Sequence, residues 1–175
     1  MFEDYIQDAY SFYNSALLAT ADREAKMYYR ASVFCSASSL EAFVNFIGDT
    51  FLHSGNLDKL EVAYLNDKTL EVIPASGEIK ERIKFNSIDN KLKLIIKKFG
   101  VTINVSSSTQ WSNFMHFKDL RDSLIHAKDL SDERTAAQYK EAIKKGLNAN
   151  IDIMNLISKA VFKRPLRTNL LDLKL

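Results

Sequence analysis

Cysteine, proline and glycine are all scarce in this chain of 175 residues, which has one cysteine, two prolines and five glycines. Because Cys35 has no possible partner within the chain, an internal disulfide is excluded, and the thiol is typical of a small core residue in a reducing compartment. The rarity of proline and glycine leaves long stretches in which apolar residues recur at helical rather than alternating spacing. The expected fold is therefore all-α, an up-and-down bundle of four to six helices.

We expect neither a membrane-spanning segment nor an export signal from this sequence. The most apolar stretch, LEAFVNFIGDTFL, contains Glu41, Asn45 and Asp49 and is shorter than the roughly 20 apolar residues that a span requires. The first ten residues, MFEDYIQDAY, are acidic and aromatic, whereas a signal peptide begins with basic residues and continues with apolar ones. We therefore expect a cytoplasmic protein that does not associate with a membrane.

The formal net charge of +2 hides an uneven distribution of acids and bases along the chain. Basic residues outnumber acidic ones in residues 78–98 and again in residues 159–174. Four lysines of the first stretch are candidates for binding an RNA backbone, namely Lys84, Lys91, Lys97 and Lys98. A solvated, lysine-rich helix face explains the same pattern without any ligand, so both interpretations stay open.

Apolar spacing predicts long helices over residues 3–19, 23–52 and 78–99, a fourth from about residue 110 through the segment RDSLIH, and a fifth from a Ser131 cap to just before Pro165. The second helix has the pattern of a bundle or dimer seam, and its small residues over 31–39 would allow a neighbouring backbone to approach closely. Residues 53–77 fit the pattern poorly, although LDKLEVAYL has the pattern of a short helix and TLEVIP that of an extended segment. We expect one domain over residues 1–165 with an insertion at about 53–77, followed by a tail over 166–175.

The strongest candidate site is the segment RDSLIH, residues 121–126. Arg121 falls on the same face of its helix as Phe117 and Ile125, which are expected to face the core. Because an unpaired buried guanidinium is costly, Arg121 should either meet a carboxylate or open into a cleft where an anion binds. Asp122 and His126 are four residues apart, close enough for the carboxylate to orient the imidazole if the helix continues that far.

Arg121 and His126 are five residues apart, which places them about 140° apart around a regular helix. They converge only if the helix ends near His126 or a second protomer completes the pocket. Two further residues are candidates for lining the site: Glu41, on the polar flank of the second helix, and Lys128, just after the motif. A capped helix end or a buried ion pair would explain the same residues without any catalysis.

RDSLIH resembles the defining motif of the HEPN superfamily, in which an arginine, directly followed by a polar residue that is often Asn or Asp, precedes a histidine by a short spacer. Arg121, Asp122 and His126 match these three positions. The segment LEAFVNFI is similar to the second helix of that family. In the family this helix is apolar and alanine-rich, contains an internal Glu and packs against the motif helix. Over most of the chain the resemblance lies in the order of the helices, and it does not explain residues 53–77.

The resemblance implies an all-α HEPN-like bundle that forms a homodimer, with the two motifs facing one another across a cleft. Many members of this family are metal-independent endoribonucleases in toxin-antitoxin, phage-defence or RNA-processing systems. By this resemblance His126 would be the general base or acid at the ribose 2′-hydroxyl and Arg121 would hold the scissile phosphate. Asp122 would orient and tune the imidazole. The implied products are a 2′,3′-cyclic phosphate and a 5′-hydroxyl, DNA being spared. RNA, a second copy and an antitoxin or other cognate protein are the implied partners, with no cofactor.

The main alternative is a HEPN-like module without nuclease activity, serving as a dimeric scaffold or as an RNA or nucleotide binder. On the nuclease interpretation, Arg121 and His126 of both protomers should line one open basic cleft, and that interpretation fails if Arg121 is instead sealed by an internal carboxylate such as Glu41. A metal site built from His116, Asp119, Asp122 and His126 is disfavoured because these residues mix helix faces and match no recognised ligand motif. Nucleophilic catalysis by Cys35 is disfavoured because no histidine neighbours it in sequence.

Overall fold

The computed structural model describes residues 1–51, 56–126 and 132–175. Within these ranges the chain forms seven helices and one antiparallel pair of strands, so the expectation of a mainly helical protein is confirmed, whereas the predicted number of four to six helices is too low. The elements are, in order, α1 (Phe2–Leu18), α2 (Asp22–Phe51), α3 (Lys59–Leu65), β1 (Lys68–Val72), β2 (Ile79–Ile83), α4 (Ile88–Phe99), α5 (Thr109–Ile125), α6 (Ala136–Phe162) and α7 (Thr168–Leu171).

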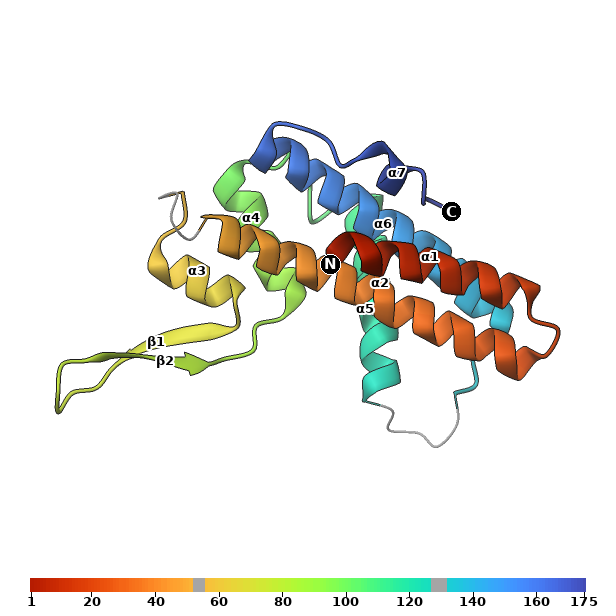
Figure 1. Ribbon diagram of the computed structural model, residues 1–175, viewed down its shortest axis with the longest axis horizontal. Coiled ribbons are helices and arrows are strands. Elements are labelled where there is room, and N and C mark those ends of the chain that lie inside the picture. The colour runs from red at the N-terminus through yellow and green to blue at the C-terminus, as the bar shows by residue number, and fades with distance from the viewer. Residues whose placement is uncertain (52–55, 127–131) are drawn as a thin grey trace.

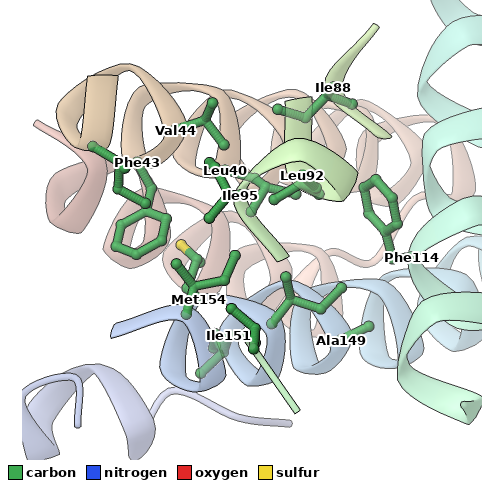
Figure 2. Close-up of a cluster of buried hydrophobic side chains, with 14 of the residues drawn as sticks. Leu40, Phe43, Val44, Ile88, Leu92, Ile95, Phe114, Ala149, Ile151 and Met154 are labelled. Atoms are coloured by element: carbon green, nitrogen blue, oxygen red, sulfur yellow. The ribbon is translucent and has the colours of Figure 1, made fainter. Parts of the chain in front are cut away.

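The centre of the fold is α2, which packs against α1, α5 and α6 (Figure 1). Figure 2 shows how side chains from α2, α4, α5 and α6 meet in the larger of two apolar clusters, where Leu40, Leu92 and Met154 are almost or fully inaccessible to water. Full burial of a side chain of this size stabilises the fold by roughly 1.5–3 kcal/mol. The smaller cluster lies around Phe117 and Tyr139, close to the candidate motif.

Small residues on α2 allow its neighbours to approach closely, as the sequence predicts. The Ser32 hydroxyl donates a hydrogen bond of 2.7 Å to the backbone oxygen of Ala9 in α1. On the α6 side, the Asn150 amide donates to the backbone oxygen of Ser36 at 3.2 Å and to its hydroxyl at 3.0 Å. Buried hydroxyl and amide groups require such partners, so these contacts also fix how α2 lies between α1 and α6.

By length and composition alone, α2 is the one helix of the described ranges that is long and apolar enough to cross a membrane. Half of its most apolar window is buried inside the protein. The core helix of a soluble protein has these same properties, so the expectation of no membrane association stays a prediction.

The helix predicted over residues 78–99 is wrong in its first part. Residues 79–83 form β2, which pairs with β1 so that Lys68 lies opposite Ile83 and Val72 opposite Ile79. The α4 helix begins only at Ile88, and Ile79 and Ile83 are exposed rather than inward. The pairing depends on residues distant in sequence, because cross-strand ion pairs join Lys68 to Glu81 and Glu71 to Arg82.

The insertion predicted at 53–77 extends in the structure to include both strands, which project from the helices as a hairpin (Figure 1). Its short helix and extended segment are confirmed as α3 and β1, while residues 52–55 lie outside the described part of the chain. The predicted cap Ser131 also lies outside it, and α6 starts at Ala136 with Thr135 as its cap. In the tail over 166–175, the short helix α7 buries Leu170 completely.

We predict that Gly146→Ala destabilises the protein, although alanine is the better helix former by about 1 kcal/mol. An added methyl group on α6 would lie 2.7 Å from the Cβ of Phe117 and closer still to its ring, and such overpacking costs roughly 1–3 kcal/mol. Urea unfolding followed by circular dichroism measures the change.

The control is the same substitution in a Phe117→Ala background, where the space is free and Gly146→Ala should become neutral or stabilising. A stabilising effect of Gly146→Ala in the otherwise unchanged protein would show that Phe117 of α5 does not lie this close to Gly146 of α6.

Candidate functional site

The motif helix α5 ends within the candidate motif. It begins after Ser108, whose hydroxyl accepts the Trp111 N–H at 3.1 Å, as expected from the run of serines. It ends at Ile125, which is half exposed rather than part of the core as predicted. His126 still donates its backbone N–H to the Asp122 carbonyl at 2.9 Å, but its own φ of −107° and ψ of 44° are not helical. The chain therefore leaves the helix at the histidine.

Arg121 and His126 line the same solvent-accessible cleft, which has a volume of about 390 Å³. Its walls come from α2, from α5, from the segment that joins β2 to α4, from the start of α4 and from the residue before β1. The residues that line it are Glu41, Asp67, Phe85, Asn86, Ser87, Ile88, Lys91, Lys118, Arg121, Asp122 and His126. The end of the helix thus brings the arginine and the histidine together within a single chain.

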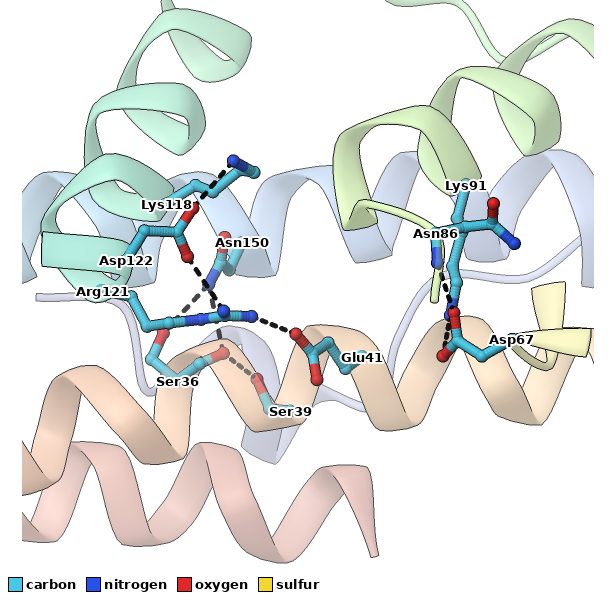
Figure 3. A network of polar contacts seen from close by, with 10 residues as sticks. All are labelled: Ser36, Ser39, Glu41, Asp67, Asn86, Lys91, Lys118, Arg121, Asp122 and Asn150. Atoms are coloured by element: carbon cyan, nitrogen blue, oxygen red, sulfur yellow. Dashed lines mark hydrogen bonds and ion pairs between the residues drawn. The ribbon is translucent and has the colours of Figure 1, made fainter. Parts of the chain in front are cut away.

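The guanidinium of Arg121 is held between two carboxylates (Figure 3). Its Nη2 donates to Oε1 of Glu41 on α2, and its Nη1 donates to Oδ1 of Asp122 at 2.9 Å. The side chain nevertheless remains 22% exposed, and it also lines a second hollow of about 240 Å³ beside Phe34 and Ser38. Arg121 therefore meets a carboxylate and also faces an open cleft, two outcomes that the sequence presented as alternatives.

Asp122 does not pair with His126, and the condition for that pairing, a helix that continues to the histidine, is not met because α5 ends at Ile125. One carboxylate oxygen accepts from Arg121 and the other accepts from Lys118 Nζ at 2.9 Å. The hydrogen bond from Lys118 to this carboxylate raises the pKa of the lysine. His126 is exposed, and among the described residues its imidazole has no hydrogen-bond partner. Asp122 thus orients two cations of the cleft rather than its histidine.

Of the four lysines predicted to bind RNA, Lys91 alone lines the cleft. It is only 4% exposed, and its Nζ lies 2.6 Å from Oδ2 of Asp67. Lys98 pairs with Glu61 at 2.8 Å, and Lys84 and Lys97 are exposed. The predicted basic helix face is therefore not formed as a unit.

Sequence reasoning missed Lys118, although its spacing of four residues from Asp122 is the signal of a helical ion pair. Lys128, the other candidate beside the motif, lies outside the described residues.

The charges of the cleft are balanced within one chain. Its three permanent cations are Lys91, Lys118 and Arg121, and each is bound to a carboxylate of Asp67, Asp122 or Glu41. A phosphate that enters the cleft must therefore compete with these carboxylates. The cleft is open, as expected of a nuclease, but it is not basic, because carboxylates balance its cations.

Asp67 ties the base of the hairpin to the wall of the cleft (Figure 3). Besides binding Lys91, its carboxylate accepts the Asn86 N–H at 2.8 Å, and its backbone oxygen accepts the Lys84 N–H at 2.8 Å. Its φ of 55° is left-handed, a conformation that aspartate tolerates better than most residues. The exposed ring of Phe85 lies between these two anchored residues.

A second polar network joins the end of α5 to the start of α6. Tyr139 is fully buried and donates its hydroxyl to Asp132, which also pairs with Arg134 at 3.1 Å. Arg134 in turn donates to the Ser123 hydroxyl at 2.9 Å. Burial and the bond to Asp132 raise the pKa of Tyr139 to about 12. Burial alone would raise the pKa of Asp132, but hydrogen bonds from Tyr139 and Arg134 outweigh it and lower that pKa.

The rival sites find little support in the described ranges. Among those residues no group of three histidine, cysteine, aspartate or glutamate side chains is placed to hold a metal ion. Burial, followed by the charge of Asp8, raises the pKa of Cys35, which keeps its thiol protonated and a poor nucleophile at neutral pH.

We predict that Asp67→Asn destabilises the protein by about 3 kcal/mol, because it leaves the Lys91 ammonium without a counterion in a nearly inaccessible position. Asparagine is chosen because it tolerates the left-handed backbone. Urea unfolding at pH 7 gives the free energy. The double variant Asp67→Asn/Lys91→Met should recover most of the loss, and a single variant within about 0.5 kcal/mol of the parent would contradict a buried ion pair.

We predict that Tyr139→Phe alters both limbs of the stability profile against pH. Because the folded pKa of Tyr139 lies above 10, its contribution is present below pH 10 and is lost as the pH rises through about 12. The lowered pKa of Asp132 contributes stability above pH 3.8 that is lost as the pH falls. The variant should lose about 2 kcal/mol at neutral pH and show a shallower slope at both extremes. Tyr5→Phe, outside this network, is the control; equal profiles for both variants would refute the coupling.

Comparison with protein-family models, with curated proteins and with solved structures found no match to this chain. The likeness to the HEPN superfamily therefore remains a resemblance carried by the motif and by the helix that contains Glu41. What the site does must be argued from its own geometry.

Proposed function

We propose that this chain is a metal-independent endoribonuclease whose catalytic groups are Arg121 and His126, with Asp122 as a positioning residue. The observation that carries the proposal is that one helix end presents a held guanidinium and an exposed imidazole to the same open cleft. RNA contains its own nucleophile, the 2′-hydroxyl, so proton transfer and charge stabilisation suffice to cleave it.

The imidazole of His126 is suited to proton transfer because it is exposed in the cleft and a ring nitrogen can accept or donate a proton. As base it removes the proton of the 2′-hydroxyl, the 2′-oxygen forms a bond to phosphorus, and the bond from phosphorus to the 5′-oxygen breaks. The leaving 5′-oxygen takes up a proton from an acid. The products are a 2′,3′-cyclic phosphate and a 5′-hydroxyl, and DNA is spared because it lacks the nucleophile.

Arg121 is suited to bind the phosphate on which negative charge develops. A guanidinium has five N–H donors, of which the bonds to Glu41 and Asp122 use two, so donors remain for a phosphate oxygen. Because the two carboxylates fix the plane of the guanidinium, little side-chain entropy is lost when the substrate binds. Lys118, held by Asp122 at the same wall, adds a second positive charge.

A homodimer is part of this proposal. One chain supplies one histidine to the cleft and balances its cations with carboxylates, so a second copy would add both an acid for the leaving oxygen and positive charge. Exposed apolar residues lie beside the motif: Phe34 is 38% exposed and Ile125 is 50% exposed. Such a patch next to a polar site is typical of a protein interface. Service in a toxin-antitoxin or phage-defence system, with a cognate protein as regulator, belongs to the same proposal.

One observation favours a second function, that of a non-catalytic dimeric scaffold or RNA or nucleotide binder with a HEPN-like fold. Every permanent cation of the cleft is already paired with a carboxylate. On this alternative Arg121 is an ion-pair tie between α2 and α5, and the cleft has no reaction to perform.

The test is cleavage of a labelled single-stranded RNA by the purified full chain at pH 7 in the presence of EDTA. We predict that the protein cuts RNA to a 2′,3′-cyclic phosphate end and that His126→Ala loses roughly 100-fold or more of the rate. Replacing the 2′-hydroxyls by 2′-O-methyl groups should prevent cleavage.

The matched control is His116→Ala, which removes an exposed histidine of the same helix that does not line the cleft and should leave the rate unchanged. If the parent and His126→Ala behave alike, the ribonuclease proposal fails and the scaffold is favoured.

A further inference from the structure

We propose that Phe85 is a base-stacking residue of the cleft, so that its ligand is a single-stranded nucleic acid with an unpaired base next to the bound phosphate. Phe85 is 86% exposed and lines the same cleft as Arg121 and His126. That the ligand is RNA and is cleaved rests on the proposed function; the stacking role rests on the geometry of the ring itself.

The backbone on both sides of Phe85 is fixed. The Lys84 N–H donates to the Asp67 carbonyl at 2.8 Å, and the Asn86 N–H donates to the Asp67 carboxylate at 2.8 Å. The Asn86 amide also donates to the carbonyls of Tyr64 at 3.0 Å and Lys84 at 3.2 Å. The segment thus holds an exposed aromatic ring at the wall of the cleft on an anchored stretch of backbone, an arrangement that lowers the entropic cost of binding.

The chemistry of the neighbouring groups matches a nucleotide. A phosphate requires cationic donors, which Arg121 and Lys118 provide, and a base requires an aromatic face, which Phe85 provides. Stacking of a base on an aromatic side chain contributes about 1–3 kcal/mol, or roughly 5-fold to 150-fold in affinity. In a duplex both faces of each base are already stacked, so the ring selects a single strand or a base that has left its stack.

The hairpin offers a competing explanation, because Val72, Ile79 and Ile83 also leave apolar side chains exposed. A protein partner that covers the hairpin would take all of them. These three aliphatic residues do not line the cleft, whereas the aromatic one does. The position of the ring therefore favours a base as its partner, and a protein interface becomes an outcome of the test.

The experiment measures binding without cleavage, using full-length His126→Ala and a short labelled RNA followed by fluorescence anisotropy. Adding Phe85→Ala should weaken binding of the single strand roughly 5-fold to 150-fold. Phe85→Leu, apolar but not aromatic, should also weaken it, whereas Phe85→Trp should restore the parent affinity. Ile83→Ala, an exposed apolar residue of β2 outside the cleft, is the matched control and should have no effect.

Two further substrates isolate stacking from other contacts. A strand of the same length with abasic sites should bind the parent and Phe85→Ala equally, and duplex RNA should be insensitive to all Phe85 variants. Because the side chain is exposed, circular dichroism should show unchanged folding for each variant.

Failure of this inference can be told apart from failure of the proposed function. If the parent does not cut RNA but binds it in a Phe85-dependent way, the ribonuclease fails and the stacking role stands. If the parent cuts RNA while Phe85→Ala and Phe85→Leu bind and cut as it does, the stacking role alone fails. The stacking role is also overturned if the parent does not bind RNA. It is overturned as well if Phe85 variants change the oligomeric mass of the protein without changing RNA binding.

Discussion

The ion pairs of Arg121 are the interaction on which the candidate site depends. The guanidinium bridges Glu41 of α2 and Asp122 of α5, and Asp122 is bound in turn by Lys118. This chain of charges lies where two core helices cross, at the margin of the apolar clusters. These ion pairs allow a cation to lie on the apolar face of α5 beside the cleft. Each charged group that loses contact with water there gains an oppositely charged partner. The fold therefore fixes the orientation of the arginine before any ligand binds.

The opposite wall of the cleft has a different origin. It belongs to the inserted segment, whose hairpin is closed at its base by Asp67, Asn86 and the nearly inaccessible Lys91. A two-stranded hairpin is marginally stable by itself, so these bonds to α4 anchor it to the helical core. The helical framework supplies Arg121 with its partners, and the inserted segment supplies Asp67 and leads to the aromatic ring of Phe85. On the proposed function, a site divided in this way would allow the insertion to select the ligand while the helices hold the reacting groups.

Local patterns predicted most of the helices, whereas contacts between residues distant in the sequence were harder to predict. The apolar spacing of α2 and the capping serine of α5 are visible in the sequence because their causes lie within a few residues. β2 was mistaken for helix because IKERI fits either period, and its strand partner lies across a turn. Glu41 was correctly singled out beside Arg121, but Asp122 was assigned to His126 because spacing alone cannot show that Lys118 and Arg121 take both of its oxygens. Phe85 gave no signal, since its importance depends on where the hairpin places it.

The central claim is that Arg121, although paired, stays open to an anion that enters the cleft beside His126. The most direct measurement is nuclear magnetic resonance of the arginine side-chain N–H groups during titration with uridine 2′,3′-cyclic phosphate, with the Arg121 signals assigned from an Arg121→Lys variant. The account predicts a saturable shift of the Arg121 signals, because a phosphate oxygen takes donors that Glu41 and Asp122 leave unused. Signals of Arg121 that stay unmoved at saturating ligand, while the protein remains folded, would contradict it and leave the arginine as a structural tie alone.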